Sequence, residues 1–213
     1  LQVALDFIDL NSALSVAKLA VKGGVDWLEC GTPLIKSIGI EAIRRLKSMF
    51  PETPVVADMK TMDTGKLEAT IAFEAGADIV SVLGVADDAT IKAAIDTARS
   101  YNGLIIVDLI NHPNPLDRIS EVERLGADIV LLHTGIDQQA RGLSPMNLIE
   151  HARKKTECYI AVAGGLDAEK AKIAVEKGAD IIIIGRYITM SGDVKLAAST
   201  VKKMMLSAKT VRS

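Results

Sequence analysis

Gly76-Ala77-Asp78-Ile79-Val80 decides how this sequence is interpreted, because the phrase recurs along the chain. Further copies occupy residues 126–130 and 178–182, and a looser copy occupies residues 23–27. In each copy a Gly ends a helical pattern, as a helix C-cap does, and an Asp precedes a short run suited to a strand. The copies lie about 50 residues apart, the length of two strand–helix units. The repeat therefore predicts alternating helices and parallel strands.

Eight short apolar runs are predicted to be strands. They are Val3–Asp6, Trp27–Cys30, Val55–Lys60, Ile79–Leu83, Leu104–Leu109, Ile129–His133, Tyr159–Ala163 and Ile181–Gly185. Amphipathic segments follow them at residues 13–22, 40–50, 66–74, 90–100, 116–124, 145–155, 168–176 and 194–207. Eight units without a linker predict one α/β domain over residues 1–213, a single (β/α)8 TIM barrel. A doubly wound open sheet is the alternative, but the regularity of the units favours closure.

The composition suits strands that are buried on both faces. Hydrophobic residues make up 49% of the chain and aromatic residues only 3%, so aliphatic side chains form the core. The formal net charge is −2 and no basic block occurs, which argues against a nucleic-acid partner. No apolar run reaches the ~18 residues of a membrane span. Cys30 and Cys158 lie in or beside apolar runs, as expected for reduced thiols of a cytoplasmic protein.

Charged residues and a histidine stand where the predicted strands end. They are Asp6, Glu29, Asp58, Lys60, Asp108 and His133. The chemistry of such barrels lies at the C-terminal ends of the strands, and unpaired buried charge is costly, so this set predicts an active site. The structural alternatives are a surface turn around Asp58, a Glu29–Lys60 salt bridge, and a core His133 bonded to backbone.

The residue types suggest distinct roles. Glu29 and Asp58 come from adjacent strands and offer hard oxygen ligands for Mg²⁺, with Mn²⁺ as an alternative. Lys60 can offset the carboxylates and stabilise a developing oxyanion. His133 can exchange protons near neutral pH, while Asp108 can position His133 or act through a water. Whether His133 or Asp108 supplies the base stays open.

Small residues end the last two predicted strands. Ala163-Gly164-Gly165 follows the seventh run, and Gly185-Arg186 follows the eighth. Such turns let backbone N–H groups approach an anion, and Arg186 can add a charge-assisted contact. Barrels often bind phosphate at this place. The sequence therefore predicts a phosphorylated substrate whose phosphate binds at these turns. Asp6, at the end of the first strand, is a further candidate for binding the substrate.

The polar stretch after the third run has the form Asp-x-Lys-x-x-Asp, made by Asp58, Lys60 and Asp63. On this motif the chain resembles, over essentially its whole length, the orotidine 5′-monophosphate decarboxylase suprafamily of barrels. Orotidine decarboxylases carry Lys at the end of the second strand, whereas this chain has Glu29. A Glu there resembles the Mg²⁺-dependent branch, in which Glu29 and Asp58 are implied to be the metal ligands.

Three further positions resemble the aldol-forming members of that branch. Members that decarboxylate 3-keto-L-gulonate 6-phosphate have Glu, Arg and Thr where this chain has Asp108, Ile136 and Ala163. The resemblance implies condensation of formaldehyde with D-ribulose 5-phosphate to a hexulose phosphate, or the reverse, through a Mg²⁺-stabilised enediolate. Decarboxylation of the keto-gulonate phosphate is the alternative.

The suprafamily's barrels are usually dimers, with the last Asp of the motif reaching the neighbouring active site. Asp63 lies three residues beyond Lys60 and cannot share the direction of that strand. The resemblance therefore implies a homodimer in which Asp63 reaches the site of the other subunit.

Overall fold

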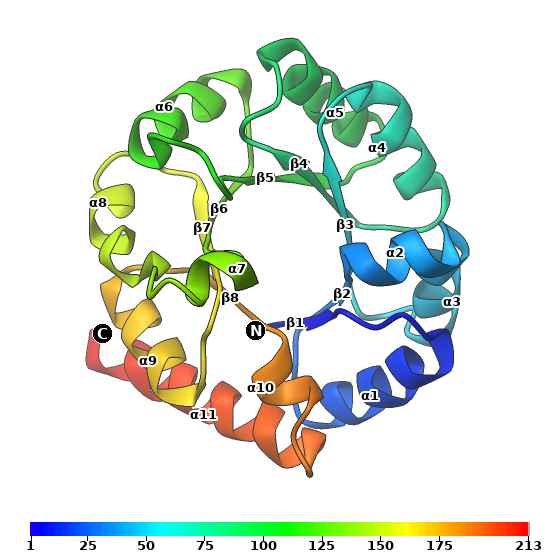
Figure 1. Ribbon diagram of the computed structural model, residues 1–213, viewed down its shortest axis with the longest axis vertical. Coiled ribbons are helices and arrows are strands. Elements are labelled where there is room, and N and C mark those ends of the chain that lie inside the picture. Colours follow the sequence, from blue (N-terminus) through cyan, green and yellow to red (C-terminus); the bar gives the residue numbers. More distant parts are fainter. Residues whose placement is uncertain (213) are drawn as a thin grey trace.

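The chain forms a closed barrel of eight parallel strands in the computed structural model, which describes residues 1–212 (Figure 1). The strands are β1 (Gln2–Leu5), β2 (Trp27–Cys30), β3 (Val55–Thr61), β4 (Ile79–Leu83), β5 (Leu104–Asp108), β6 (Ile129–His133), β7 (Tyr159–Ala163) and β8 (Ile181–Ile184). β8 returns to β1 through the pairs Gln2↔Ile183 and Val3↔Ile184. This closure confirms the predicted TIM barrel and excludes the open sheet.

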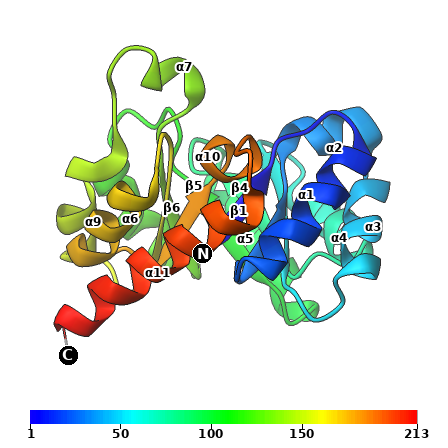
Figure 2. The same cartoon turned by 90° about the horizontal axis from the view of Figure 1, so that it is seen from below.

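Helices surround the barrel and fill the connections between its strands (Figures 1 and 2). They are α1 (Leu10–Lys22), α2 (Thr32–Ile38), α3 (Glu41–Met49), α4 (Gly65–Glu74), α5 (Asp88–Ser100), α6 (Pro115–Leu125), α7 (Ile136–Gln139), the 3-10 helix η1 (Pro145–Asn147), α8 (Ile149–Arg153), α9 (Ala168–Lys177), α10 (Arg186–Thr189) and α11 (Val194–Arg212). None of these described helices is both long and apolar enough to cross a lipid bilayer.

The predicted helices are found, with one interruption and three additions. The segment predicted as one helix at residues 145–155 begins as a 3-10 turn, because the Ser144 hydroxyl accepts the N–H of Met146 and closes a tight first turn. The short helices α2, α7 and α10 are additional. They have seven residues or fewer, which is too short for a helical period to emerge from the sequence.

The recurrent Gly-Ala-Asp phrase has a structural role at the N-terminal end of the barrel. The Asp78 carboxylate accepts the backbone N–H of Val55 at 2.7 Å, and the Asp180 carboxylate accepts that of Ile160 at 2.8 Å. Each Asp therefore ties its own strand to the start of the preceding one. Gly126 takes φ 98° at the end of α6, a left-handed conformation that favours glycine.

Alternate strand residues point into the barrel and form an interior core. Its buried members are Ala4, Val56, Ile79, Ile106, Ile129, Leu131, Ala161, Ala163, Ile181 and Ile183. Four predicted site residues each lie two positions beyond an interior residue; they are Asp6, Asp58, Asp108 and His133. Glu29 lies two positions beyond Trp27, which packs against this core. Strand alternation therefore directs them toward the axis, at the C-terminal mouth.

Candidate active site

Four carboxylates meet at the C-terminal mouth of the barrel. Glu29, Asp58 and Asp108 are buried, with 7%, 7% and 0% of their surfaces exposed. Asp6 lies at the rim and is exposed. Neighbouring protein removes part of the water around its carboxyl group, and this loss of hydration, followed by the charge of Asp58, raises the pKa of Asp6. Gly31 allows the close approach at the rim, since a Cβ there would lie 2.2 Å from Asp6 Oδ1.

Lys60 reaches two of these carboxylates. Its Nζ lies 2.7 Å from Asp58 Oδ2 and 3.4 Å from Asp108 Oδ2. Regular strand alternation does not produce this proximity, because the β3–β4 register shifts between Ala57 and Thr61 and Lys60 takes φ 48°. Burial lowers the pKa of Lys60, but Asp58 and Asp108 outweigh it and raise the pKa, so the ammonium group stays charged.

The Asp58 carboxylate is held by two hydroxyl groups as well as by Lys60. Ser81 Oγ donates to Asp58 Oδ1 at 2.8 Å, and Thr32 Oγ1 donates to Asp58 Oδ2 at 2.8 Å. Burial raises the pKa of Asp58, but Lys60 and these hydrogen bonds outweigh it and hold the pKa below its ordinary value. Asp58 is therefore an ionised, oriented side chain and not part of a surface turn.

Glu29 has a different environment. Its Oε2 accepts a hydrogen bond from Gln2 Nε2 at 2.5 Å, and it forms no ion pair with Lys60 among the described residues, so the structural alternative for Glu29 is not found. Burial, then the charges of Asp58 and Asp6, raise its pKa well above the ordinary value. Three carboxylates thus face one ammonium group in this part of the mouth, an arrangement that a cation would relieve.

The open acceptor positions fit a hard cation. An ionised carboxylate has about four lone-pair positions. On Asp58, hydrogen bonds occupy one lone-pair position of Oδ1 and two of Oδ2. Glu29 Oε1 accepts no hydrogen bond from the described residues. Within residues 1–212 no group of three or more His, Cys, Asp and Glu side chains is arranged to enclose a metal. The two carboxylates with open positions, Glu29 and Asp58, are the kind of oxygen ligand that Mg²⁺ takes together with several waters or substrate oxygens.

His133 is paired with Asp108. Its Nδ1 lies 2.8 Å from Asp108 Oδ2, and Asp108 Oδ1 accepts the backbone N–H of Ile110 at 2.9 Å. His133 is therefore bonded to a carboxylate and not to backbone, as the structural alternative required. An Nδ1–H that donates to Asp108 leaves the Nε2 lone pair available to accept a proton.

The ends of β7 and β8 provide the backbone that was predicted to bind phosphate. Gly164 and Gly165 take φ 118° and 66°, and a Cβ on Gly164 would lie 2.4 Å from the carbonyl oxygen of Thr134. A side chain is therefore excluded at Gly164. A Cβ on Gly185 would lie 3.7 Å from Asp6 Oδ2, so the β8 turn borders the carboxylate cluster.

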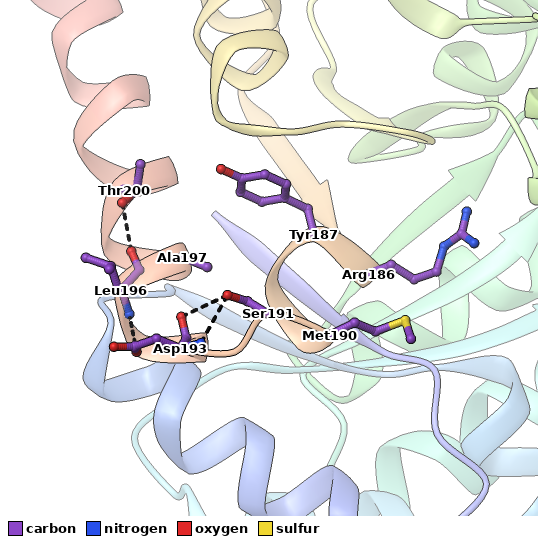
Figure 3. A pocket seen from close by; sticks show the side chains of 8 residues that line it. All are labelled: Arg186, Tyr187, Met190, Ser191, Asp193, Leu196, Ala197 and Thr200. Carbon is purple, nitrogen blue, oxygen red and sulfur yellow. Dashed lines mark hydrogen bonds between the residues drawn. The ribbon is translucent and has the colours of Figure 1, made fainter.

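Arg186 begins α10, and its exposed side chain makes no hydrogen bond or ion pair with another described residue. A groove of about 340 Å³ lies between α10 and the start of α11, lined by Arg186, Tyr187, Met190, Ser191, Asp193, Leu196, Ala197 and Thr200. Figure 3 shows the Arg186 guanidinium pointing away from Leu196 and Thr200 on α11. The charged end of Arg186 is therefore directed away from the far wall of the groove.

Asp63 does not join the carboxylate cluster of its own barrel. It is exposed between β3 and α4, where its Oδ1 accepts the N–H of Thr64. A groove of about 560 Å³ borders it, between the starts of α4 and α5. Met62, Leu67 and Ile71 are large apolar side chains exposed on the same segment. Asp63 and these apolar side chains therefore form an exposed part of the surface.

Three polar residues of the site were missed in the sequence: Gln2, Thr32 and Ser81. Gln2 and Ser81 each interrupt an apolar run at an interior position, which is a usable signal once the barrel is assumed. Thr32 is the first residue of α2, and nothing in its sequence context distinguishes it from any other Thr at a helix start.

Comparison with known proteins identifies the class. The model of the orotidine 5′-phosphate decarboxylase / HUMPS family matches residues 1–201. A 3-hexulose-6-phosphate synthase of Mycobacterium gastri is 41% identical over 202 residues, 95% of this chain and 97% of the relative. The structure of 3-hexulose-6-phosphate synthase from Salmonella typhimurium has a TM-score of 0.93 at 36% identity, covering 97% of this chain and 98% of that one.

A structure of 3-keto-L-gulonate-6-phosphate decarboxylase from Vibrio cholerae is also similar, with a TM-score of 0.84 and 26% identity over 97% of both chains. The fold is thus shared across the family, while the higher identities are to the synthases. The chain belongs to the orotidine 5′-phosphate decarboxylase / HUMPS family, in its 3-hexulose-6-phosphate synthase branch. This confirms both the resemblance inferred from Asp58, Lys60 and Asp63 and the choice of branch from Asp108, Ile136 and Ala163.

Proposed function

We propose that this chain condenses formaldehyde with D-ribulose 5-phosphate to D-arabino-hex-3-ulose 6-phosphate, or catalyses the reverse cleavage. The observation that carries the proposal is the convergence, in one mouth, of the carboxylates of Glu29 and Asp58, the charged Lys60 and the His133–Asp108 pair. The relatives named as 3-hexulose-6-phosphate synthases support it, since they match nearly the full chain.

Glu29 and Asp58 are proposed to hold a divalent cation, Mg²⁺ or Mn²⁺, through the acceptor positions that their hydrogen bonds leave open. When bound, such an ion polarises ketose oxygens and acidifies the neighbouring C1 proton. Gln2, Ser81 and Thr32 orient the two carboxylates. The chain's own residues then provide the remaining steps.

His133 is proposed to remove the C1 proton of ribulose 5-phosphate through Nε2. Asp108 holds Nδ1 and stabilises the imidazolium that forms. The electron pair left on C1 makes an enediolate, whose charge the ammonium of Lys60 is placed to stabilise. C1 then attacks the formaldehyde carbon, and the former carbonyl oxygen of formaldehyde takes a proton from the imidazolium. Atoms and charge balance without an oxidant or reductant.

The β7 and β8 turns are proposed to bind the substrate phosphate. Gly164, Gly165 and Gly185 bring backbone close to the mouth, and the Arg186 guanidinium is uncommitted among the described residues. Asp6, beside the β8 turn, is proposed to accept a hydrogen bond from a sugar hydroxyl. Ala163 is paired with His133 in the sheet register, so its small side chain leaves room beside the imidazole.

A homodimer is proposed to complete the site. Asp63 is exposed, and the apolar side chains of Met62, Leu67 and Ile71 are exposed on the same segment, which suits burial against another subunit. Asp63 of one subunit would then contact the substrate in the neighbouring barrel. Sedimentation that shows only monomer under assay conditions would contradict this arrangement.

The function is tested by following formaldehyde with purified chain, Mg²⁺ and ribulose 5-phosphate. Formaldehyde should disappear, a hexulose phosphate should accumulate, and EDTA should stop both. The competing activity is measured as CO₂ release from 3-keto-L-gulonate 6-phosphate. Ile136, 59% exposed on α7, cannot supply a cationic side chain there, so that release should be slower. Faster release of CO₂ than consumption of formaldehyde would overturn the assignment.

A further inference from the structure

Ser81 links two parts of the active site through one hydroxyl group. It lies in the middle of β4, is 2% exposed, and alternates with Ile79, so its side chain points into the barrel. Its Oγ donates to Asp58 Oδ1 at 2.8 Å and accepts the backbone N–H of Lys60 at 3.0 Å. Both functions of the hydroxyl, donor and acceptor, are thus directed at the Asp-x-Lys motif.

The backbone that Ser81 holds is unusual. Lys60 has φ 48°, a left-handed conformation that non-glycine residues rarely adopt, and the β3–β4 register shifts around it. Such a conformation persists only where surrounding contacts maintain it. The N–H of Lys60 finds its acceptor on the side chain of Ser81, on the strand next to the bulge. The bulge in turn brings Lys60 Nζ to Asp58 and Asp108.

We propose that Ser81 is a positioning residue, which fixes the Asp58 carboxylate and the Lys60 bulge relative to each other. This inference rests on the proposed function, in which Asp58 is a cation ligand and Lys60 stabilises the enediolate. If the Ser81 hydroxyl only satisfied its own hydrogen bonds in the core, its removal would lower the stability of the fold and nothing else. A positioning hydroxyl also predicts loss of cation affinity and of turnover.

The test compares Ser81→Ala, which removes the hydroxyl, with Ser81→Thr, which keeps it. Thr97→Val is the matched control, because Thr97 is also buried and its hydroxyl donates to Ala93 O on α5, outside the site. Binding of Mn²⁺ without substrate is measured from the electron paramagnetic resonance signal of the free ion. Steady-state constants are measured with ribulose 5-phosphate and formaldehyde.

Ser81→Ala should weaken Mn²⁺ binding by ~10–100-fold, the usual effect of losing a partner of a metal ligand, and should lower kcat more than it raises KM. Ser81→Thr should restore most of both, and Thr97→Val should change neither. Wild-type Mn²⁺ affinity in Ser81→Ala, or equal losses in the Ala and Thr variants, would overturn the proposal. If Ser81→Ala does not fold, Ser81→Cys replaces it, since a thiol is a weak donor; wild-type affinity in that variant would equally overturn it.

The Mn²⁺ measurement separates this inference from the proposed function. If the wild-type chain binds Mn²⁺ but does not condense formaldehyde, the proposed reaction is refuted. The role of Ser81 would then be decided by the Mn²⁺ affinity of Ser81→Ala alone. Wild-type chain that binds no Mn²⁺ would refute both.

Discussion

His133 Nδ1 lies 2.8 Å from Asp108 Oδ2, and Lys60 Nζ lies 3.4 Å from the same oxygen. One fully buried carboxylate oxygen therefore holds both the proposed base and the proposed oxyanion stabiliser. Because Asp108 is also fixed by the N–H of Ile110, it orients these two side chains as a unit. This arrangement favours His133 as the group that takes the proton, with Asp108 orienting the imidazole, over Asp108 as the base itself.

Glu29→Gln should weaken divalent cation binding. The change keeps the shape of the side chain but replaces an anionic ligand oxygen with a neutral amide. The dissociation constant for Mn²⁺, measured by titration calorimetry, should rise by more than the ~10–100-fold that loss of an outer partner causes. Glu68→Gln is the control, since Glu68 bonds to Thr61 outside the carboxylate cluster. Unchanged affinity in Glu29→Gln would show that Glu29 is not a ligand.

The same variant should be more stable than wild type when metal is absent. The folded-state pKa of Glu29 is raised, so the folded chain binds more protons than the unfolded chain between the two pKa values. The free energy of unfolding of wild type should therefore fall as pH rises from the ordinary pKa of 4.5 through the raised pKa.

Glu29→Gln lacks this titration, so urea unfolding in EDTA should find it more stable than wild type near pH 8 and about equal near pH 3. Excess Mg²⁺ should reverse the order, because the wild type, which retains both ligands, binds the ion more tightly and is therefore stabilised more. A wild type that is the more stable at pH 8 in EDTA would contradict the prediction.

The two cysteines should be unreactive in the folded chain. Burial, then the charges of Glu29 and Asp58, raises the pKa of Cys30 to about 12, and burial also raises the pKa of Cys158. The thiolate is the reactive form, so an aromatic disulfide reagent at pH 8 should label neither thiol rapidly. Both should react on addition of denaturant. Labelling of either thiol at the denatured rate without denaturant would refute the burial described for it.

Asp63 can be tested by complementation between subunits. Asp63→Asn and Lys60→Ala should each be inactive alone. In a mixed dimer, the Asp63→Asn subunit keeps its own Lys60 and receives Asp63 from the other subunit, so one intact site forms. Random reassociation of equal amounts should restore about a quarter of wild-type activity, since half of the dimers are mixed and each has one site. No recovery, in mixtures shown to exchange subunits, would place Asp63 outside the neighbouring site.

The sequence predicted the barrel and most of its mouth for a physical reason. Strand alternation has a fixed period, so Asp58 and Glu29 inherit their inward direction from Val56 and Trp27. The bulge at Lys60 was not predictable, because Lys is not a residue type that marks a left-handed conformation.

The hydrogen-bond partners of the carboxylates were also beyond the sequence. Gln2 and Ser81 stand out in their apolar runs once the barrel is assumed, but which carboxylate each one meets depends on distances between strands. Thr32, at the start of α2, has no distinguishing pattern. The side-chain direction of Arg186 likewise depends on α10, a helix of four residues, which is too short to be predicted from a sequence pattern.

The most direct test of the account is exchange of the C1 hydrogen of ribulose 5-phosphate with deuterated water, followed by NMR without formaldehyde. Wild type with Mg²⁺ should exchange it, and EDTA should stop the exchange. His133→Asn should slow it by ~10²–10⁴-fold, the range for loss of a general base, while Mn²⁺ binding is unchanged. Exchange by His133→Asn at the wild-type rate, or no exchange by wild type, would contradict the proposed mechanism.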